Sequence, residues 1–290
     1  MICSICPRKC NAERTEMSGA GFCAMPAGIV AAKAMLHFWE EPCLSGTNGA
    51  LCVFFTGCNL GCSYCQNGVI SRENFGKPVS PARLREVIDG FVARGAHCVD
   101  LVTPTHFTPW VLEALRDPLP VPVVWNCGGY ERVETLRTLA GKVQVYLPDL
   151  KYADAGLAAA LSRAPDYFEV ACAAVDEMYR QTGPYRMGED GLLQSGVIIR
   201  HMVLPGQLDN TKRVIDYVAR RFAPGEVLFS LMSQYTPRPG ASGALARRVT
   251  GAEYRAAADY MRACGIVDGF VQEKSSAKEE YTPDFDLSGL

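Results

Sequence analysis

The feature of this sequence that most constrains its fold is a regular alternation of short apolar runs with segments of helical spacing. The runs are rich in β-branched and aromatic residues, as expected for strands that are covered on both faces. The expected strands are 51–56, 98–102, 122–126, 143–147, 197–204 and 227–232, followed by a short one at 270–272. Helical spacing of apolar residues occupies 84–91, 111–115, 133–139, 168–179, 214–222 and 253–264. This alternation predicts a parallel α/β sheet, built either as an open doubly wound sheet or as a partial barrel.

The composition supports a folded chain and excludes several classes of protein. Of the 290 residues, 48% are hydrophobic and 21% are charged, which is enough apolar material for a buried core. The net charge of −2 and the isoelectric point of about 6.1 argue against a nucleic-acid partner. The sequence has no secretory pattern and no run of about 18 apolar residues, so we expect a cytoplasmic protein with no membrane partner.

Thirteen cysteines stand out, because clustered cysteines in a reducing compartment bind metal more often than they form disulfides. One cluster lies near the start of the chain and comprises Cys3, Cys6, Cys10 and Cys23. A second cluster comprises Cys58, Cys62 and Cys65. The others are scattered, mostly in or beside apolar runs, and are expected to be free thiols: Cys43, Cys52, Cys98, Cys127, Cys172 and Cys264.

The second cluster directly follows the first expected strand, with spacings of four and three residues between Cys58, Cys62 and Cys65. Three thiolates so close in sequence can wrap one metal centre. Zinc and iron–sulfur clusters usually take four protein ligands, so a centre with three cysteines leaves one coordination position open. An open position can bind a reactant, which makes these three cysteines the candidate catalytic centre.

Polar residues close or follow nearly every expected strand. The carboxyl ends of parallel strands meet at one edge of a sheet, where ligands bind in βα folds. Turn and cap chemistry explains any one of these residues more easily than all of them together. The candidate site residues at this edge are Thr103, Thr105, His106, Asn126, Asp149, Lys151, Arg200 and His201, the last two lying within the fifth strand.

The first cluster has the spacing C-x2-C-x3-C, with its fourth cysteine two residues after Gly21. This spacing suits either structural zinc or an auxiliary iron–sulfur cluster. Arg8, Lys9 and Arg14 would offset the charge of four thiolates. The alternative is a loose N-terminus with free thiols.

Glu40 and Glu41 precede Pro42 and leave two interpretations open. In the first interpretation, one of the two carboxylates contacts a cofactor or substrate near the cysteine loop. In the second, the pair forms a solvated acidic turn.

The motif Cys58-x3-Cys62-x2-Cys65, with Tyr64 before its third cysteine, resembles the signature of the radical S-adenosylmethionine (SAM) superfamily. The resemblance extends over nearly the whole chain. Within the superfamily, the chain is similar to one subgroup, the bacterial homologues of the pyruvate formate-lyase activating enzyme. The stretches that carry it are 3–10, 37–42, 54–60, 102–106, 128–130, 146–152, 200–206 and 230–235.

The resemblance implies a partial (β/α)6 barrel of the TIM type. It implies that Cys58, Cys62 and Cys65 hold a [4Fe–4S] cluster whose open iron binds SAM, and that the chain cleaves SAM reductively to a 5′-deoxyadenosyl radical. Tyr64 would then lie beside the adenine of SAM. Thr103, Thr105 and His106 stand where the superfamily usually has a Gly-Gly-Glu motif. The resemblance also implies that Lys151 and Arg200 contact SAM and that Asp149 helps to bind a monovalent cation. Asn126 stands where the activases tend to carry an aspartate, and His201 lies beside Arg200 as a further implied contact.

The expected organisation is a cysteine-rich metal-binding segment (1–44), a radical SAM core (45–272) and a C-terminal tail (273–290). The leading function is hydrogen abstraction from a glycyl residue of a partner glycyl-radical enzyme. The alternatives are radical modification of a small molecule or peptide, and a non-catalytic iron–sulfur or zinc protein. The resemblance also implies a low-potential electron donor such as flavodoxin or ferredoxin.

Overall fold

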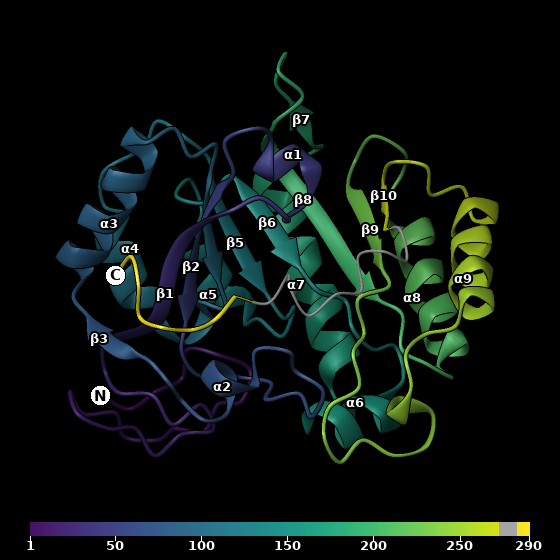
Figure 1. Ribbon diagram of the computed structural model, residues 1–290, viewed down its shortest axis with the longest axis horizontal. Coiled ribbons are helices and arrows are strands. Elements are labelled where there is room, and N and C mark those ends of the chain that lie inside the picture. The colour runs from purple at the N-terminus through teal and green to yellow at the C-terminus, as the bar shows by residue number, and fades with distance from the viewer. Residues whose placement is uncertain (273–282) are drawn as a thin grey trace.

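A computed structural model of the protein describes residues 1–272 and 283–290. Its central feature is a row of six parallel strands that pair in the order in which they occur along the chain. These strands are β2 (Ala50–Phe55), β4 (Val99–Val102), β5 (Val123–Cys127), β6 (Val145–Pro148), β8 (Leu193–Met202) and β9 (Leu228–Met232). Each is followed by a helix (Figure 1). The predicted α/β class and partial (β/α)6 barrel are confirmed.

Shorter or antiparallel strands extend both edges of this row. β1 (Ile29–His37) runs antiparallel to β2, and β3 (Lys77–Val79) runs antiparallel to β1. β10 (Gly269–Val271) lies parallel to β9, and β7 (Arg186–Met187) pairs with β8. The sequence had not predicted β1, which lies within the segment 1–44 and yet pairs with β2, so the sheet crosses the expected boundary at residue 44.

Six of the α-helices in the described part of the chain match the expected periodic segments: α3 (Pro81–Ala93), α4 (Thr108–Ala114), α5 (Val133–Arg137), α7 (Tyr167–Thr182), α8 (Leu208–Arg221) and α9 (Gly251–Ala263). Three short ones were not expected: α1 (Pro42–Ser45), α2 (Gly68–Ser71) and α6 (Ala155–Ser162). Two 3-10 turns, η1 (Thr105–Phe107) and η2 (Gly243–Ala246), complete the set in the described residues. The helix α6 follows β6 directly and carries Ser162, a residue of the site described below.

Side-chain caps begin three of these helices and explain where they start. Ser80 accepts from the backbone N–H of Arg83 at the start of α3, and Asp154 accepts from Leu157 at the start of α6. Thr250 and Glu253 form a reciprocal capping box on α9. Such caps satisfy backbone N–H groups that a helix leaves without partners.

The two faces of the sheet serve different purposes. Because successive side chains of a strand point to opposite faces, alternate residues pack against the helices and against the concave interior. Trp125 and Tyr146 are fully buried on the helix side, in the larger of two cores. The concave side holds a smaller apolar core. It also carries polar residues, among them Asp100, Asn126 and Arg200, which lie on neighbouring strands.

The end of the chain returns to the sheet. Residues 283–290 run along β1, where Leu287 donates to the carbonyl of Ala32 and Ala34 donates to that of Ser288, both at 3.0 Å. Phe285 packs edge-on against Phe54 of β2, with the ring centres 5.5 Å apart. The segment 283–290 is drawn in yellow in Figure 1. Of the expected tail 273–290, residues 273–282 lie outside the described residues, and the rest is docked on the sheet. No helix among the described residues is long and apolar enough to cross a membrane.

Candidate functional site

A cavity of about 930 Å³ opens at the carboxyl ends of the parallel strands. Its size is at the upper end of the range usual for cofactor and substrate pockets. All three cysteines of the second cluster line it, together with Tyr64. Of the residues expected at the strand ends, five line it: Thr103, Asn126, Asp149, Lys151 and Arg200. The fold therefore brings to one cavity two groups of residues that the sequence separates widely.

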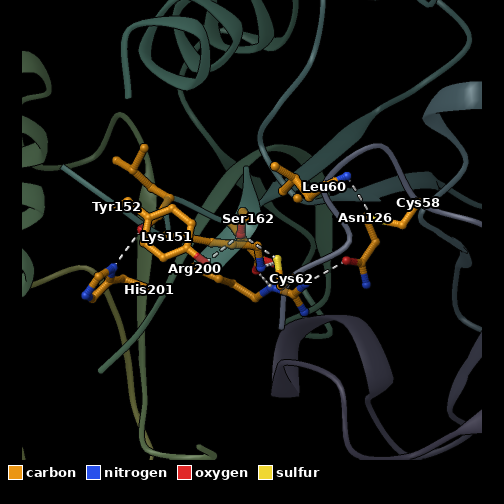
Figure 2. Close-up of polar contacts among 12 residues, drawn as sticks. Cys58, Leu60, Cys62, Asn126, Lys151, Tyr152, Ser162, Arg200 and His201 are labelled. Carbon is orange, nitrogen blue, oxygen red and sulfur yellow. Dashed lines mark hydrogen bonds and ion pairs between the residues drawn. The ribbon is translucent and has the colours of Figure 1, made fainter. Parts of the chain in front are cut away.

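The three cysteines lie in the loop between β2 and α2. Cys62 is buried and accepts from Ser162 Oγ at 3.0 Å, and Cys58 accepts from the backbone N–H of Leu60 at 3.3 Å (Figure 2). Burial raises the pKa of Cys58 to about 12 and also raises that of Cys65. Without a metal these groups are thiols, so bound iron would have to displace their protons, as is general for thiolate ligands.

The separation of the three sulfur atoms fits a cluster better than a single ion. Among the described residues, the only group of three potential ligands whose atoms all lie within 4.8 Å of one another contains none of Cys58, Cys62 and Cys65. Around one zinc ion, sulfur atoms stand about 3.8 Å apart, given a Zn–S distance of about 2.3 Å and tetrahedral angles. At least one pair of the three sulfurs is therefore wider than one ion would hold it, which suits ligands on separate irons. The donor set therefore fits an iron–sulfur cluster.

A chain of hydroxyl groups leads away from the sulfur of Cys62. Ser162 Oγ and the phenol oxygen of Tyr152 lie 2.7 Å apart, and the phenol oxygens of Tyr152 and Tyr64 also lie 2.7 Å apart. Tyr64 is itself buried against Tyr235, with ring centres 6.0 Å apart. Sequence reasoning did not single out Ser162, because it lies on the helix α6, which has no readable apolar period.

Charged residues that lie in or follow the strands β1, β6 and β8 also line the cavity, and Lys151 and Arg200 are labelled among them in Figure 2. Lys151 Nζ lies 2.5 Å from Asp149 Oδ2, and Arg200 Nε lies 3.1 Å from Asp149 Oδ1. Arg200 Nη2 donates to Asn126 Oδ1 at 2.6 Å, and its Nη1 lies 3.4 Å from Glu40 Oε2. The guanidinium is thus engaged on three sides by protein groups.

The position of Asp149 depends on a glycine at the end of the neighbouring strand β5. Gly129 has φ +76°, and a β-carbon there would lie 2.1 Å from the carbonyl oxygen of Asp149. Only glycine tolerates both this backbone conformation and this close approach. The Gly-Gly pair after β5 therefore sets the spacing between two strand ends at the cavity.

These contacts keep the charged groups ionised. Burial alone would raise the pKa of Asp149, but Lys151 and Arg200 outweigh it and hold the pKa below its usual value. Burial would likewise lower the pKa of Lys151 and of Arg200, but Asp149 outweighs it and both are raised. The pair Asp149 and Lys151 therefore carries fixed charges throughout the neutral range.

A compact group of possible ligands lies on the concave face and includes Glu40, Cys52 and Asp100. Asp100 Oδ2 accepts from Cys52 Sγ at 3.4 Å and from Asn126 Nδ2 at 3.1 Å. Burial, and then the charge of Glu40, raises the pKa of Asp100 to about 8. In the sequence, the only indication of this group is an aspartate inside an otherwise apolar strand, and the sequence predicts an ordinary free thiol for Cys52.

Three expected contacts are not brought to the cavity: among the described residues, Thr105, His106 and His201 do not line it. Arg200 points to the concave face, so its neighbour His201 points to the helix side, where it meets Leu150 O at 2.6 Å and Thr211 Oγ1 at 2.9 Å. Thr105 and His106 are turned inward by η1. Thr105 Oγ1 donates to Glu131 at 2.5 Å, and His106 Nε2 lies 2.7 Å from Thr56 O. All three side chains have partners that account for them as structural groups.

The first cluster of cysteines lies outside the cavity, in the N-terminal segment that gathers on the same side of the molecule as α2 (Figure 1, purple). Cys3 and Cys6 are buried, Cys23 is half-buried and Cys10 is exposed. None of the thirteen cysteines forms a disulfide.

The chain is similar to several known proteins. No family model matches the chain. One curated relative is the uncharacterized protein MJ0674 of Methanocaldococcus jannaschii, 28% identical over 253 residues that span 81% of this chain and 66% of that protein.

Solved structures are similar at lower identity. SuiB of Streptococcus suis, bound to S-adenosylmethionine, matches with a TM-score of 0.51 and 11% identity over 75% of this chain and 48% of its own. Methylornithine synthase (PylB) matches with a TM-score of 0.50 and 15% identity over 74% of this chain and 61% of its own. This chain therefore spans about half to two thirds of the length of the proteins that it matches. It shares the partial-barrel fold of these two solved structures.

Proposed function

We propose that this protein is a radical SAM enzyme. A [4Fe–4S] cluster held by Cys58, Cys62 and Cys65 would supply one electron that cleaves SAM reductively and yields a 5′-deoxyadenosyl radical. The observation that carries the proposal is the convergence of these three cysteines, in the spacing C-x3-C-x2-C, on one cavity with Asp149 and Lys151. A non-catalytic metal protein would need neither the cavity nor the charged groups.

The chain's own residues would bind, orient and shield the reactants. The ammonium of Lys151 stays protonated and lies where it can offset the negative charge of a thiolate-bound centre, since the charges of Cys62 and Cys65 contribute to its raised pKa. The aromatic side of the cavity, which includes Tyr64, offers an apolar wall for a nucleoside base. Ser162 donates to the sulfur of Cys62, which favours the negative charge that a thiolate ligand carries.

Arg200 has a different part in this proposal from the one expected of it. Its donors are already engaged by Asp149, Asn126 and Glu40. We assign it to positioning these groups rather than to binding the carboxylate of SAM. Asp149 already has two cationic partners, so the proposal includes no monovalent cation beside it.

The substrate proposed first is a glycyl residue of a partner enzyme. The support is the resemblance of eight stretches of the chain to activating enzymes of glycyl-radical enzymes. The second candidate is a peptide or small molecule. It is favoured by the similar fold of SuiB, which was also solved bound to the precursor peptide SuiA, with a TM-score of 0.51 and 11% identity over 75% of this chain and 47% of its own. Either reaction requires a low-potential one-electron donor, for which flavodoxin and ferredoxin are the proposed partners.

The formation of 5′-deoxyadenosine tests the enzyme proposal. The protein is reconstituted anaerobically with iron and sulfide, reduced with dithionite and mixed with SAM. We expect 5′-deoxyadenosine from the wild type and from Cys172→Ala, whose thiol lies on α7 away from the cavity, and none from Cys62→Ala. No 5′-deoxyadenosine from a wild type that contains the cluster would refute the proposal.

A partner experiment separates the two substrate classes. The reduced enzyme and SAM are incubated with candidate glycyl-radical enzymes from the same cell, and the electron paramagnetic resonance spectrum is recorded. A glycyl-radical signal selects the activating reaction. Its absence, with 5′-deoxyadenosine still formed, selects the peptide or small-molecule class.

A further inference from the structure

The N-terminal segment folds its four cysteines into one neighbourhood. A bridge between Ile2 and Glu13 joins the two arms of the segment, with Cys3 N–H donating to Ala12 O at 2.9 Å. Each arm ends in a tight turn: Lys9 N–H donates to Cys6 O at 3.1 Å, and Ala24 N–H donates to Gly21 O at 2.9 Å. Cys6 lies in the first of these turns and Cys23 lies in the second.

Burial and close packing show that the segment is not a loose terminus. Cys3 and Cys6 are buried and Cys23 is half-buried. A β-carbon at Gly21, two residues before Cys23, would lie 2.9 Å from Cys10 Sγ. A loose terminus would leave these thiols exposed.

A buried cation accompanies this group. The guanidinium of Arg14 is only 2% exposed, and its Nη1 lies 3.7 Å from Cys3 Sγ and 2.7 Å from the carbonyl oxygen of His106. Its Nε donates to the carbonyl oxygens of Met25 and Pro26, each at 2.9 Å. A buried guanidinium with only neutral partners around it is costly unless an anion lies beside it. A centre bound by thiolates would supply that negative charge.

The spacing of the sulfur atoms favours one kind of metal centre over another. Tetrahedral zinc would hold the sulfurs about 3.8 Å apart. Among the described residues, no three cysteine sulfurs all lie within 4.8 Å of one another. The first cluster of cysteines therefore lacks the close grouping that one zinc ion would hold. A [4Fe–4S] cluster binds its four thiolates on four separate irons, which allows a wider spacing.

We propose that Cys3, Cys6, Cys10 and Cys23 bind a second [4Fe–4S] cluster, closed by four thiolates, and not a zinc ion. This centre does not depend on the reaction proposed above. It lies directly behind the loop of the first: a β-carbon at Gly57, the residue before Cys58, would lie 3.1 Å from the carbonyl oxygen of Cys23.

Further contacts tie the segment to that loop. Arg8 Nε donates to Asn59 O at 2.7 Å, and its Nη2 donates to Ser162 O at 2.7 Å. The same guanidinium stacks on Phe22, 3.9 Å from the ring centre. The segment that carries the second cluster thus supports the backbone around the first.

Metal analysis of three proteins tests the proposal. The wild type, the variant Cys58→Ala/Cys62→Ala/Cys65→Ala and the variant Cys3→Ser/Cys6→Ser are purified anaerobically from cells supplied with both iron and zinc, then reconstituted. We expect about eight iron and eight sulfide per wild-type chain and about four of each in either variant, with little zinc throughout. The triple variant should keep a brown chromophore and, once reduced, an electron paramagnetic resonance signal.

Two results of the metal analysis would overturn the proposal. One is a triple variant that contains about one zinc per chain in place of iron, and the other is a triple variant that contains no bound metal. Cys172→Ala/Cys264→Ala, which changes two half-buried thiols outside both groups, is the matched control and should keep all its iron. If the triple variant does not fold, Cys10→Ser replaces it. This exposed position should lower the iron of the otherwise intact chain by about half, and unchanged iron with zinc present would count against the cluster.

Discussion

At the scale of single residues, the hydrogen bond from Ser162 to the sulfur of Cys62 is a contact with a functional consequence. Hydrogen bonds to cluster sulfurs help to set the reduction potential. Ser162→Ala removes a donor that stabilises the more negative, reduced state, so the potential should fall. The measurement is a potentiometric titration of the cluster whose electron paramagnetic resonance signal responds to SAM.

The control is a variant of Tyr152, whose hydroxyl group contacts Ser162. Tyr152→Phe removes this hydroxyl group and leaves the hydrogen bond from Ser162 to Cys62 in place. It should shift the potential less than Ser162→Ala does. Equal shifts, or no shift in either variant, would show that the serine does not tune this sulfur.

Arg200 allows a second prediction at this scale, on stability. Arg200→Ala leaves Asp149 without one of its two cations and Glu40 without its partner, in side chains that are about 15% exposed. Removal of one partner from a buried ion pair typically costs about 3–5 kcal/mol. We expect a loss of this size in the free energy of unfolding, measured by urea denaturation of the reconstituted protein.

An exposed ion pair provides the comparison for Arg200. Arg213 lies 3.3 Å from Asp154, with exposed fractions of 59% and 44%. Exposed pairs contribute less than ~1 kcal/mol, so Arg213→Ala should change stability little. Similar losses in the two variants would contradict the assignment of Arg200 to a buried positioning network.

Several of these residues could be predicted from sequence, and others could not. The three cysteines and the pair Asp149 and Lys151 stand at fixed distances from strand ends, so a correct strand assignment places them. Ser162 could not be predicted in this way, because its contact with Cys62 joins positions 100 residues apart.

At the scale of elements, the alternation of side chains along a strand explains the most instructive difference between sequence and structure. Arg200 and His201 are adjacent in β8, so only one of them can face the cavity. His201 faces the helices and is neutral, since burial lowers its pKa to about 4. Its Leu150 and Thr211 contacts suit a ring that donates through Nδ1 and accepts through Nε2.

A pH dependence follows from this burial. Because the pKa of His201 is lower in the folded state than its usual 6.5, the unfolded chain takes up a proton first as the pH falls. Stability is therefore lost progressively between about pH 6.5 and pH 4. Between pH 7 and pH 5 the wild type should lose about 1–2 kcal/mol more than His201→Asn does.

Urea denaturation at the two pH values measures this difference. Thr211→Val keeps the histidine and should keep the full pH dependence, although it removes one hydrogen bond. If His201→Asn and the wild type lose the same stability between pH 7 and pH 5, the histidine is not held neutral by the fold.

The elements that sequence reasoning missed share a physical cause. β1 is rich in alanine and carries Lys33, so it lacks the composition of a strand and forms through its pairing with β2. The helix α6 (AGLAAALS) is nearly all apolar, so it shows no amphipathic period. In both cases tertiary contacts, and not local preference, decide the structure.

At the scale of the whole molecule, the alternation of strands and helices left a doubly wound sheet and a partial barrel open, and only the resemblance implied the barrel, in which the parallel strands pair in chain order. Two long-range arrangements could not be predicted. The C-terminal residues 283–290 return to β1, and the N-terminal segment packs behind the loop of the candidate catalytic cysteines. Both depend on contacts between an end of the chain and the side of the sheet formed by β1 and β2, for which the sequence carries no local signal.

The electron paramagnetic resonance spectrum of the reduced wild-type protein, recorded before and after SAM is added, tests the central claim most directly. Three cysteine ligands leave an iron with an open position, so SAM should shift the signal of the cluster held by Cys58, Cys62 and Cys65. The signal of a cluster with four thiolates should not change, and Cys62→Ser should abolish the response. A cluster-containing protein whose spectrum is the same with and without SAM would contradict the claim.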